Sequence, residues 1–339
     1  MSGRWLQLRV LTRAAFARLF DAGTPGAHDQ KTMFFWLLAC LSAPGALIPF
    51  LLGQGSGTAP LVHGALPSSA WGWAMVARFQ GVDALRALSF TDKTFYLGCA
   101  VAASALLTVV VWTRVLPDRR DALVLGPLPV RPATVVVSRL AALAAYVGAT
   151  AVAMHALASI VFGVELAAGN TVVFALRGIV AHFVASCGAG AFVFLALAGV
   201  QGLLLVLVGP RVFARVAPAA QALVVALAMG AALAIPAISR AAAAALTAGT
   251  PVHSWVFWTP PFWFLGVYET VLGTSDPRLH GLAMTAGLAL AGAMLLVAST
   301  YPIVYARVLR ASLERPRTAT RWTAAVLHAV AVRLSRDSR

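Results

Sequence analysis

Long apolar runs, separated by short polar segments, constrain this chain more than any other feature of its sequence. Six runs are long enough to cross a hydrocarbon core of about 30 Å as helices. Charged residues make up only 11% of the chain, whereas soluble domains contain roughly 25%. The sequence therefore predicts an all-α integral membrane protein. The six expected spans cover about residues 33–52, 95–115, 134–162, 171–208, 219–238 and 279–301.

Basic residues predict the orientation of these spans. With the amino terminus inside, the cytosolic segments hold 19 of the 26 Lys and Arg residues and the outer segments hold six. The positive-inside rule then predicts a multi-pass protein of the plasma or inner membrane with both termini cytosolic. This pattern explains the net charge of +15 better than a nucleic-acid-binding surface does.

The chain is expected to have three parts, and the first is amphipathic. Trp5, Leu8 and Phe16 share one side of a helix over residues 4–20, which arginines flank. Such a helix favours the cytosolic lipid surface, with an ordinary soluble tail as the alternative. The three parts are a cytosolic amphipathic segment (1–32), a six-helix transmembrane domain (33–305) and a basic cytosolic tail (306–339).

The segment between the first two spans, about residues 54–94, is expected to be an extracytoplasmic loop. It begins with Gly, Pro and Ser residues, contains Trp71 and Trp73, and ends at Asp92 and Lys93. Because tryptophans collect at the level of the lipid headgroups, the loop is predicted to contain an interfacial helix.

A charged, proline-rich segment from Leu116 to Pro132 interrupts the apolar pattern between the second and third spans. An aspartate can cap a short helix here, and Gly126 and Pro127 would end it. About two helical turns are unstable in water without a partner, so this element is expected to dock on another protein. A loop that carries only positive-inside charges is the alternative. The expected contact residues, within about 117–129, are Asp118, Arg119, Arg120, Asp121, Leu123, Leu125, Leu128 and Pro129.

The order of these residues resembles the cytosolic coupling helix of ABC-2 type exporter permeases. A membrane segment precedes Pro-Asp-Arg-Arg-Asp, an apolar run leads to Gly-Pro-Leu-Pro-Val, and the next segment opens with Arg139. The resemblance implies a permease subunit that couples ATP hydrolysis to export of a lipid, a hydrophobic compound or a polymer. It also implies two partners besides membrane lipid: an ABC ATPase subunit and a second permease half, in a homodimer or a heterodimer.

Motifs that would give the chain its own chemistry are missing from the sequence. It contains no G-x-x-x-x-G-K-[ST] loop, so this chain is expected to bind no cofactor, and ATP and Mg are expected on the partner subunit. It also contains no His-Glu-x-x-His motif and no closely paired acids, so neither a metal site nor an enzyme is expected.

A second distinctive segment, about residues 250–275, crowds aromatic residues around a Pro-Pro pair. Aromatic residues gather at membrane interfaces, and the segment resembles the re-entrant or interfacial helix pair that precedes the last span of ABC-2 exporters. An aromatic-rich loop that only anchors the protein is the alternative. The residues expected at this outer interface are Trp258, Pro260, Pro261, Trp263 and Glu269.

Ionisable residues within the apolar runs are the remaining candidates. His155, Arg177 and His182 are expected to line a polar path, with a hydrogen bond between helices as the alternative for the histidines. Three other functions stay open: a multi-span membrane enzyme, an ion-coupled carrier and a non-transporting membrane scaffold. A carrier should show intramembrane acids or broken helices repeated in two halves.

Overall fold

A computed structural model describes residues 3–20, 32, 39, 70–112, 130–166, 171–247 and 255–314. Every element in these ranges is helical, and four helices are long and apolar enough to cross a membrane. The prediction of an all-α membrane protein is confirmed at this level. The predicted coupling helix, and all of the predicted first span except one residue, lie outside the described ranges. The elements are α1 (Gly3–Phe20), α4 (Ala70–Val110), α7 (Pro132–Leu166), α8 (Val172–Thr247), η1 (Trp255–Trp258), α9 (Pro260–Leu272) and α10 (Pro277–Glu314).

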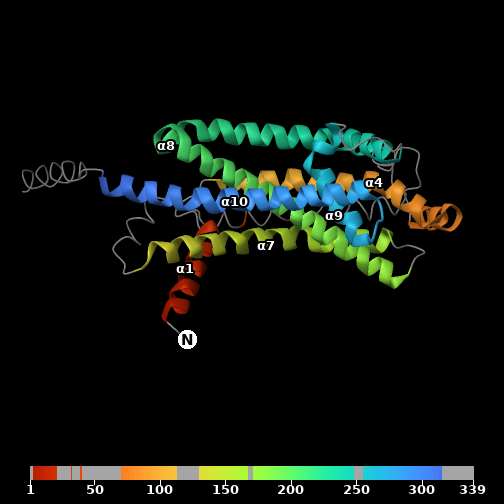
Figure 1. The fold of residues 1–339 in the computed structure, drawn as a ribbon, viewed down its shortest axis with the longest axis horizontal. Coiled ribbons are helices and arrows are strands. Elements are labelled where there is room, and N and C mark those ends of the chain that lie inside the picture. The colour runs from red at the N-terminus through yellow and green to blue at the C-terminus, as the bar shows by residue number, and fades with distance from the viewer. Residues whose placement is uncertain are drawn as a thin grey trace, which may run out of the picture.

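The long helices run lengthwise through the molecule, and α8 folds back on itself (Figure 1). Its apolar stretch, Val172–Ala241, has 70 residues, whereas one crossing needs about 20. The helix breaks at Gly209, where φ is 76° and ψ is 165°. Glycine adopts this conformation without a steric penalty, and Pro210 can start the returning arm because the first helical residue needs no bonded N–H.

The reversal corrects the predicted boundaries of the fourth and fifth spans. These spans are the two helical arms of α8, which meet at Gly209, and the expected ten-residue turn over 209–218 is a break at Gly209 followed directly by helix. Arg211 and Arg215, predicted in that turn, are exposed residues on the first turns of the returning arm.

The segment expected as an outer loop with a helix is helical from residue 70 onward, and the boundary predicted at Lys93 is wrong. Residues 70–110 form one continuous helix, α4, so no loop separates Lys93 from the span that follows. The sequence from Ala70 to Val110 contains no proline that would break the helix. Similarly, α10 continues to Glu314, so the segment expected to form a tail from residue 306 begins as helix.

Three clusters of buried side chains hold the described helices together, and the smallest contains Ala105, Val193 and Ala228. The largest cluster joins α4, α8, α9 and α10 through residues such as Leu97, Phe262 and Leu265. The second joins α4, α7, α8 and α10, and Phe16 of α1 packs against it. The predicted amino-terminal helix is therefore present, and its second half is attached to the bundle, while Trp5 near its start is exposed.

Candidate functional site: a buried polar cluster at the junction of α4, α8 and α9

An ion pair between Lys93 and Glu269 joins α4 to α9. The Lys93 Nζ atom donates a hydrogen bond to Glu269 Oε1, and the two side chains are 0% and 1% exposed. Removing two charges from water costs several kcal/mol for each ion, and close pairing offsets part of this cost. The other carboxylate oxygen, Glu269 Oε2, is buried and accepts no hydrogen bond from the part of the chain that the structure describes. Each charge of the pair therefore depends on the other to offset the cost of its burial.

Aromatic side chains surround this pair. Lys93 Nζ lies 5.0 Å from the centre of the Tyr268 ring, a cation–π distance. The His182 ring lies edge-on to the rings of Tyr96 and Tyr268, at centroid distances of 5.7 and 5.8 Å. We call these five residues, Lys93, Tyr96, His182, Tyr268 and Glu269, the buried polar cluster. It ties three helices together at one place.

The local sequence explains how α9 presents its share of the cluster. Thr259 is the N-cap, and prolines occupy the first two helical positions, where their missing N–H groups are not needed. Gly273 ends the helix in a left-handed conformation, with φ of 89°. The indole N–H of Trp263 donates to the carbonyl oxygen of Phe257 at 3.0 Å and so fastens η1 to the helix. The Pro-Pro pair and Trp263 thus define the start of α9.

The predicted outer residues fall into two groups in the structure. Trp258 is 72% exposed, and Pro260, Pro261 and Trp263 are half-buried. Glu269, which the sequence places in the same segment, points instead into the protein and belongs to the buried polar cluster. The segment is thus a short 3-10 turn with an exposed Trp258 and a buried Phe257, followed by a helix with buried residues from Phe262 to Leu272.

The three residues predicted to line a polar path, His155, Arg177 and His182, do not all lie in the same part of the structure. His155 and His182 are both buried, on α7 and α8. Arg177 is exposed near the start of α8, and its guanidinium lies close to Gly273 at the end of α9. The structure therefore brings the two histidines into the interior and leaves the arginine at the surface.

Sequence reasoning missed the roles of Lys93, Tyr96 and Tyr268. One signal was available, because Lys93 is one of only two lysines and stands in a long proline-free stretch next to apolar residues. A helix over that stretch would also place Lys93 and Tyr96 on one face, three residues apart. Their partners on α8 and α9 could not be read from the same pattern.

The Tyr268 hydroxyl offers a test of the cluster. Burial, and then the neighbouring Glu269 carboxylate, raise the pKa of Tyr268 well above its usual value, so the phenol stays protonated. Its hydroxyl has no hydrogen-bond partner among the described residues. We expect Tyr268→Phe to keep or raise the free energy of unfolding, by up to about 1 kcal/mol, because it removes an unpaired polar group.

Tyr268→Leu is the matched comparison, because it also removes the ring that contacts Lys93 and His182. We expect it to lower the free energy of unfolding by about 1–2 kcal/mol. Thermal unfolding of both variants in the same detergent measures the difference. A Phe variant as unstable as the Leu variant would show that the hydroxyl, rather than the ring, holds the cluster.

The described part of the chain contains no group of three His, Cys, Asp or Glu side chains placed to bind a metal ion together. The buried polar cluster is a site of ion pairing and aromatic contact between helices. No family model, no curated protein and no solved structure matches this chain.

Proposed function

We propose that this chain is the permease subunit of an ABC-2 type exporter. A separate ATPase would drive export of a lipid, a hydrophobic compound or a polymer, and a second permease half would complete the path. The observation that carries the proposal is the short helix α9, docked between α4 and α10 at the end of the bundle opposite the carboxyl end of α4 and the amino end of α7 (Figure 1).

The dimensions of α9 fit an outer element that enters the membrane without crossing it. Its 13 residues span about 20 Å, less than a hydrocarbon core of about 30 Å. It directly precedes α10, the last described helix of spanning length. This order, a short aromatic-rich helix followed by the last span, matches the resemblance to ABC-2 exporters.

The opposite end of the bundle suits a coupling role. The carboxyl end of α4 and the amino end of α7 lie at this end (Figure 1), and the predicted coupling helix connects them. Inside the bundle, the Gln201 side-chain amide donates to the carbonyl oxygen of Trp112 at 2.6 Å and fastens the end of α4 to α8. A push on the connecting segment would therefore pass to α4 and α8 together, as a rigid-body shift.

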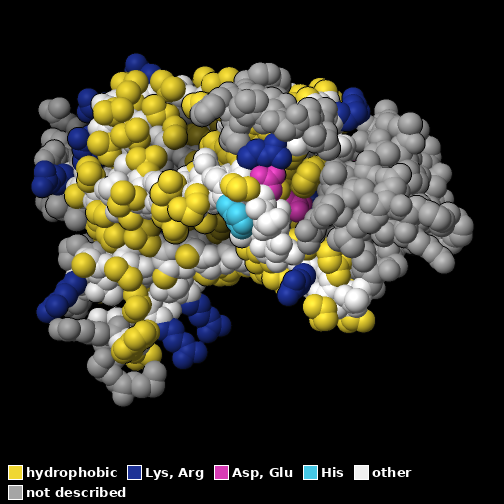
Figure 2. Space-filling model, turned by 45° about the vertical axis from the view of Figure 1, so that its right-hand side comes forward, with side chains coloured by type: hydrophobic (Ala, Val, Ile, Leu, Met, Phe, Trp, Pro, Cys, Tyr) yellow, Lys and Arg dark blue, Asp and Glu magenta, His cyan; other side chains and the backbone are white. Residues whose placement is uncertain are grey.

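The charge distribution supports an arrangement with the coupling end in the cytosol. Apolar side chains cover most of the described surface, and the acidic side chains in view occupy one small area (Figure 2). Lys93, Arg177 and Arg278 are the basic residues near α9. Away from α9, exposed basic residues lie next to the start of α7, at the reversal of α8 and near the end of α10: Arg131, Arg211, Arg215, Arg307 and Arg310. By the positive-inside rule, this distribution favours a cytosolic position for the end of the bundle at which α7 begins, which fits the proposed plasma or inner membrane protein with both termini cytosolic.

An ion-coupled carrier is the second candidate, and the buried polar cluster favours it. Carriers use ionisable groups inside the membrane to bind protons or ions. Glu269 and His182 are such groups, and both are almost fully buried. A carrier would transport without an ATPase partner, so the partner distinguishes the two functions.

Co-purification with a candidate ABC ATPase tests the permease proposal. We expect a stable complex with the unmodified chain and a loss of at least about tenfold in bound ATPase for Leu123→Asp or Leu125→Asp, because each buries a charge in the contact. Thr320→Asp, which adds the same charge to the carboxyl-terminal segment, is the control and should leave the complex intact. A complex that survives both leucine substitutions would show that the coupling surface lies elsewhere.

A further inference from the structure

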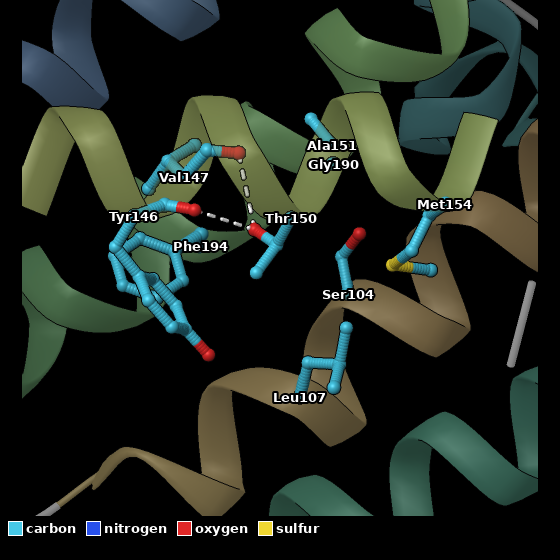
Figure 3. A pocket seen from close by; sticks show the side chains of 9 residues that line it. All are labelled: Ser104, Leu107, Tyr146, Val147, Thr150, Ala151, Met154, Gly190 and Phe194. Carbon is cyan, nitrogen blue, oxygen red and sulfur yellow. Dashed lines mark hydrogen bonds between the residues drawn. The ribbon is translucent and has the colours of Figure 1, made fainter. Parts of the chain in front are cut away.

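A pocket inside the bundle is too small for a ligand larger than water. It lies between α4, α7 and the first arm of α8 (Figure 3), and its volume of about 20 Å³ has space for about one water molecule. Among its lining residues, Ser104, Tyr146 and Thr150 contribute hydroxyl groups. This pocket therefore offers no place for a lipid, whereas the outer surface of the helices does.

Four exposed arginines lie where α8 reverses and where α10 approaches its end. Arg211 and Arg215 are on the first turns of the returning arm of α8, and Arg307 and Arg310 are near the end of α10. The Arg307 guanidinium donates a hydrogen bond to the carbonyl oxygen of Val206, in the last turn of the first arm of α8. This bond places the end of α10 beside the reversal of α8, at the left-hand end of the molecule in Figure 1. We call these four residues the arginine patch.

The charge of the arginine patch is not balanced by its neighbours. Arg211 and Arg215 are four residues apart, and Arg307 and Arg310 are three apart, so each pair shares one side of its helix. None of the four forms an ion pair with another residue that the structure describes. Guanidinium groups bind phosphate oxygens through paired N–H donors. The patch can therefore bind a phosphate group.

Exposed apolar side chains lie next to the patch. Leu207, on the first arm of α8, is 71% exposed, and Ile303, one turn before Arg307 on α10, is 45% exposed. Both stand on helices of membrane-spanning length and composition, so they face the acyl chains of lipids. Basic and apolar side chains also lie side by side at the left-hand edge of Figure 2. A molecule that covers the patch thus meets phosphate-binding groups beside an apolar surface.

We propose that the arginine patch binds the headgroup of an anionic phospholipid, whose acyl chains lie against Leu207 and Ile303. The phosphate accepts hydrogen bonds from the guanidinium groups. A zwitterionic lipid also carries a phosphate, but the unbalanced arginines repel its ammonium group, so a headgroup with a net negative charge is favoured. An acidic protein surface would match the charge but not the lipid-facing side chains beside it. The inference needs only the membrane-spanning helices and is independent of the proposed export function.

Photo-crosslinking of the purified full-length chain in phosphatidylcholine vesicles tests the patch. The vesicles contain a trace of one of two probes, phosphatidylglycerol or phosphatidylcholine, and both probes carry the same acyl chain with a diazirine. We expect phosphatidylglycerol to label the peptides that cover residues 203–216 and 300–310 at least about tenfold more than phosphatidylcholine does. The reason is that each arginine near a membrane surface favours an anionic lipid by about fivefold.

Arg211→Gln/Arg215→Gln should lower this preference at least about fivefold, because it removes two charges and leaves the Arg307 contact in place. Arg9→Gln/Arg13→Gln on α1 is the matched control. It also removes two exposed arginines that are four residues apart, and it should leave the preference unchanged. Since all four of these side chains are exposed, both variants should fold, and gel filtration checks this.

Three results would overturn the proposal. One is equal labelling by the two probes. Another is a preference that survives Arg211→Gln/Arg215→Gln, or that falls equally in the control variant and so reflects net charge alone. The third is competition by inorganic phosphate that sodium chloride of the same ionic strength does not reproduce, which would assign the patch to a free phosphate ion. If the Arg211 and Arg215 variant lost a bound ATPase but kept its lipid preference, the patch would belong to a protein partner.

Discussion

Lys93→Met should lower the free energy of unfolding by about 3–5 kcal/mol, because it leaves the Glu269 carboxylate buried without its counter-ion. The carboxylate is 1% exposed and cannot reach water without moving α9. Methionine keeps the length of the side chain, so the loss measures the missing charge rather than a cavity. Thermal unfolding and gel filtration in detergent measure the effect, and most of the protein is expected to aggregate or melt early.

The double variant Lys93→Met/Glu269→Met separates the ion pair from the packing. It removes both charges, and we expect it to recover most of the lost stability, since apolar residues of similar volume often replace a buried pair without cost. Arg278→Met is the control, because the Arg278–Asp276 pair is 33% and 26% exposed and should contribute only about 0–1 kcal/mol. A Lys93 variant as stable as the Arg278 variant would contradict the role given to the buried pair.

Hydrophobicity predicted the fold well where a helix has apolar residues and clear ends. The spans expected over 134–162 and 279–301 correspond to α7 and α10, because their apolar composition alone requires a membrane-length helix. It predicted the reversal between the fourth and fifth spans but not how short that reversal is. Gly209 alone reverses α8 through its backbone conformation, whereas the sequence predicted a turn of ten residues.

The candidate site was harder to predict for a different reason. Lys93 and Glu269 are 176 positions apart, and a single sequence shows where charges occur but not which of them meet. Both were interpreted as charges near the outer ends of spans, which is the common place for such residues. His182 was recognised as a candidate because ionisable residues inside apolar runs are rare and costly, whereas Glu269 was predicted only as part of the aromatic outer segment.

Gly266→Ala is the second change that should have a large effect. A Cβ at Gly266 would lie 2.5 Å from the amide nitrogen of Ala283 and 2.5 Å from the carbonyl oxygen of Leu279. Both are backbone atoms of α10, which cannot turn aside as a side chain would. We expect α9 to shift away from α10 at a cost of about 3 kcal/mol, at the upper end of the range for overpacking. Thermal unfolding measures it, with Gly281→Ala as the control, since no atom lies within 4 Å of that Cβ.

The two large effects should also depend on one another, because α9 is held on both sides. Glu269 fastens it to α4, and the close approach at Gly266 fastens it to α10. Once Gly266→Ala has moved α9, the Lys93–Glu269 pair is already disturbed, so adding Lys93→Met should cost less than it does alone. The double-mutant cycle should give a coupling energy of about 1 kcal/mol or more. Strict additivity would mean that the two contacts act on separate parts of the molecule, and that α9 does not respond as one rigid element.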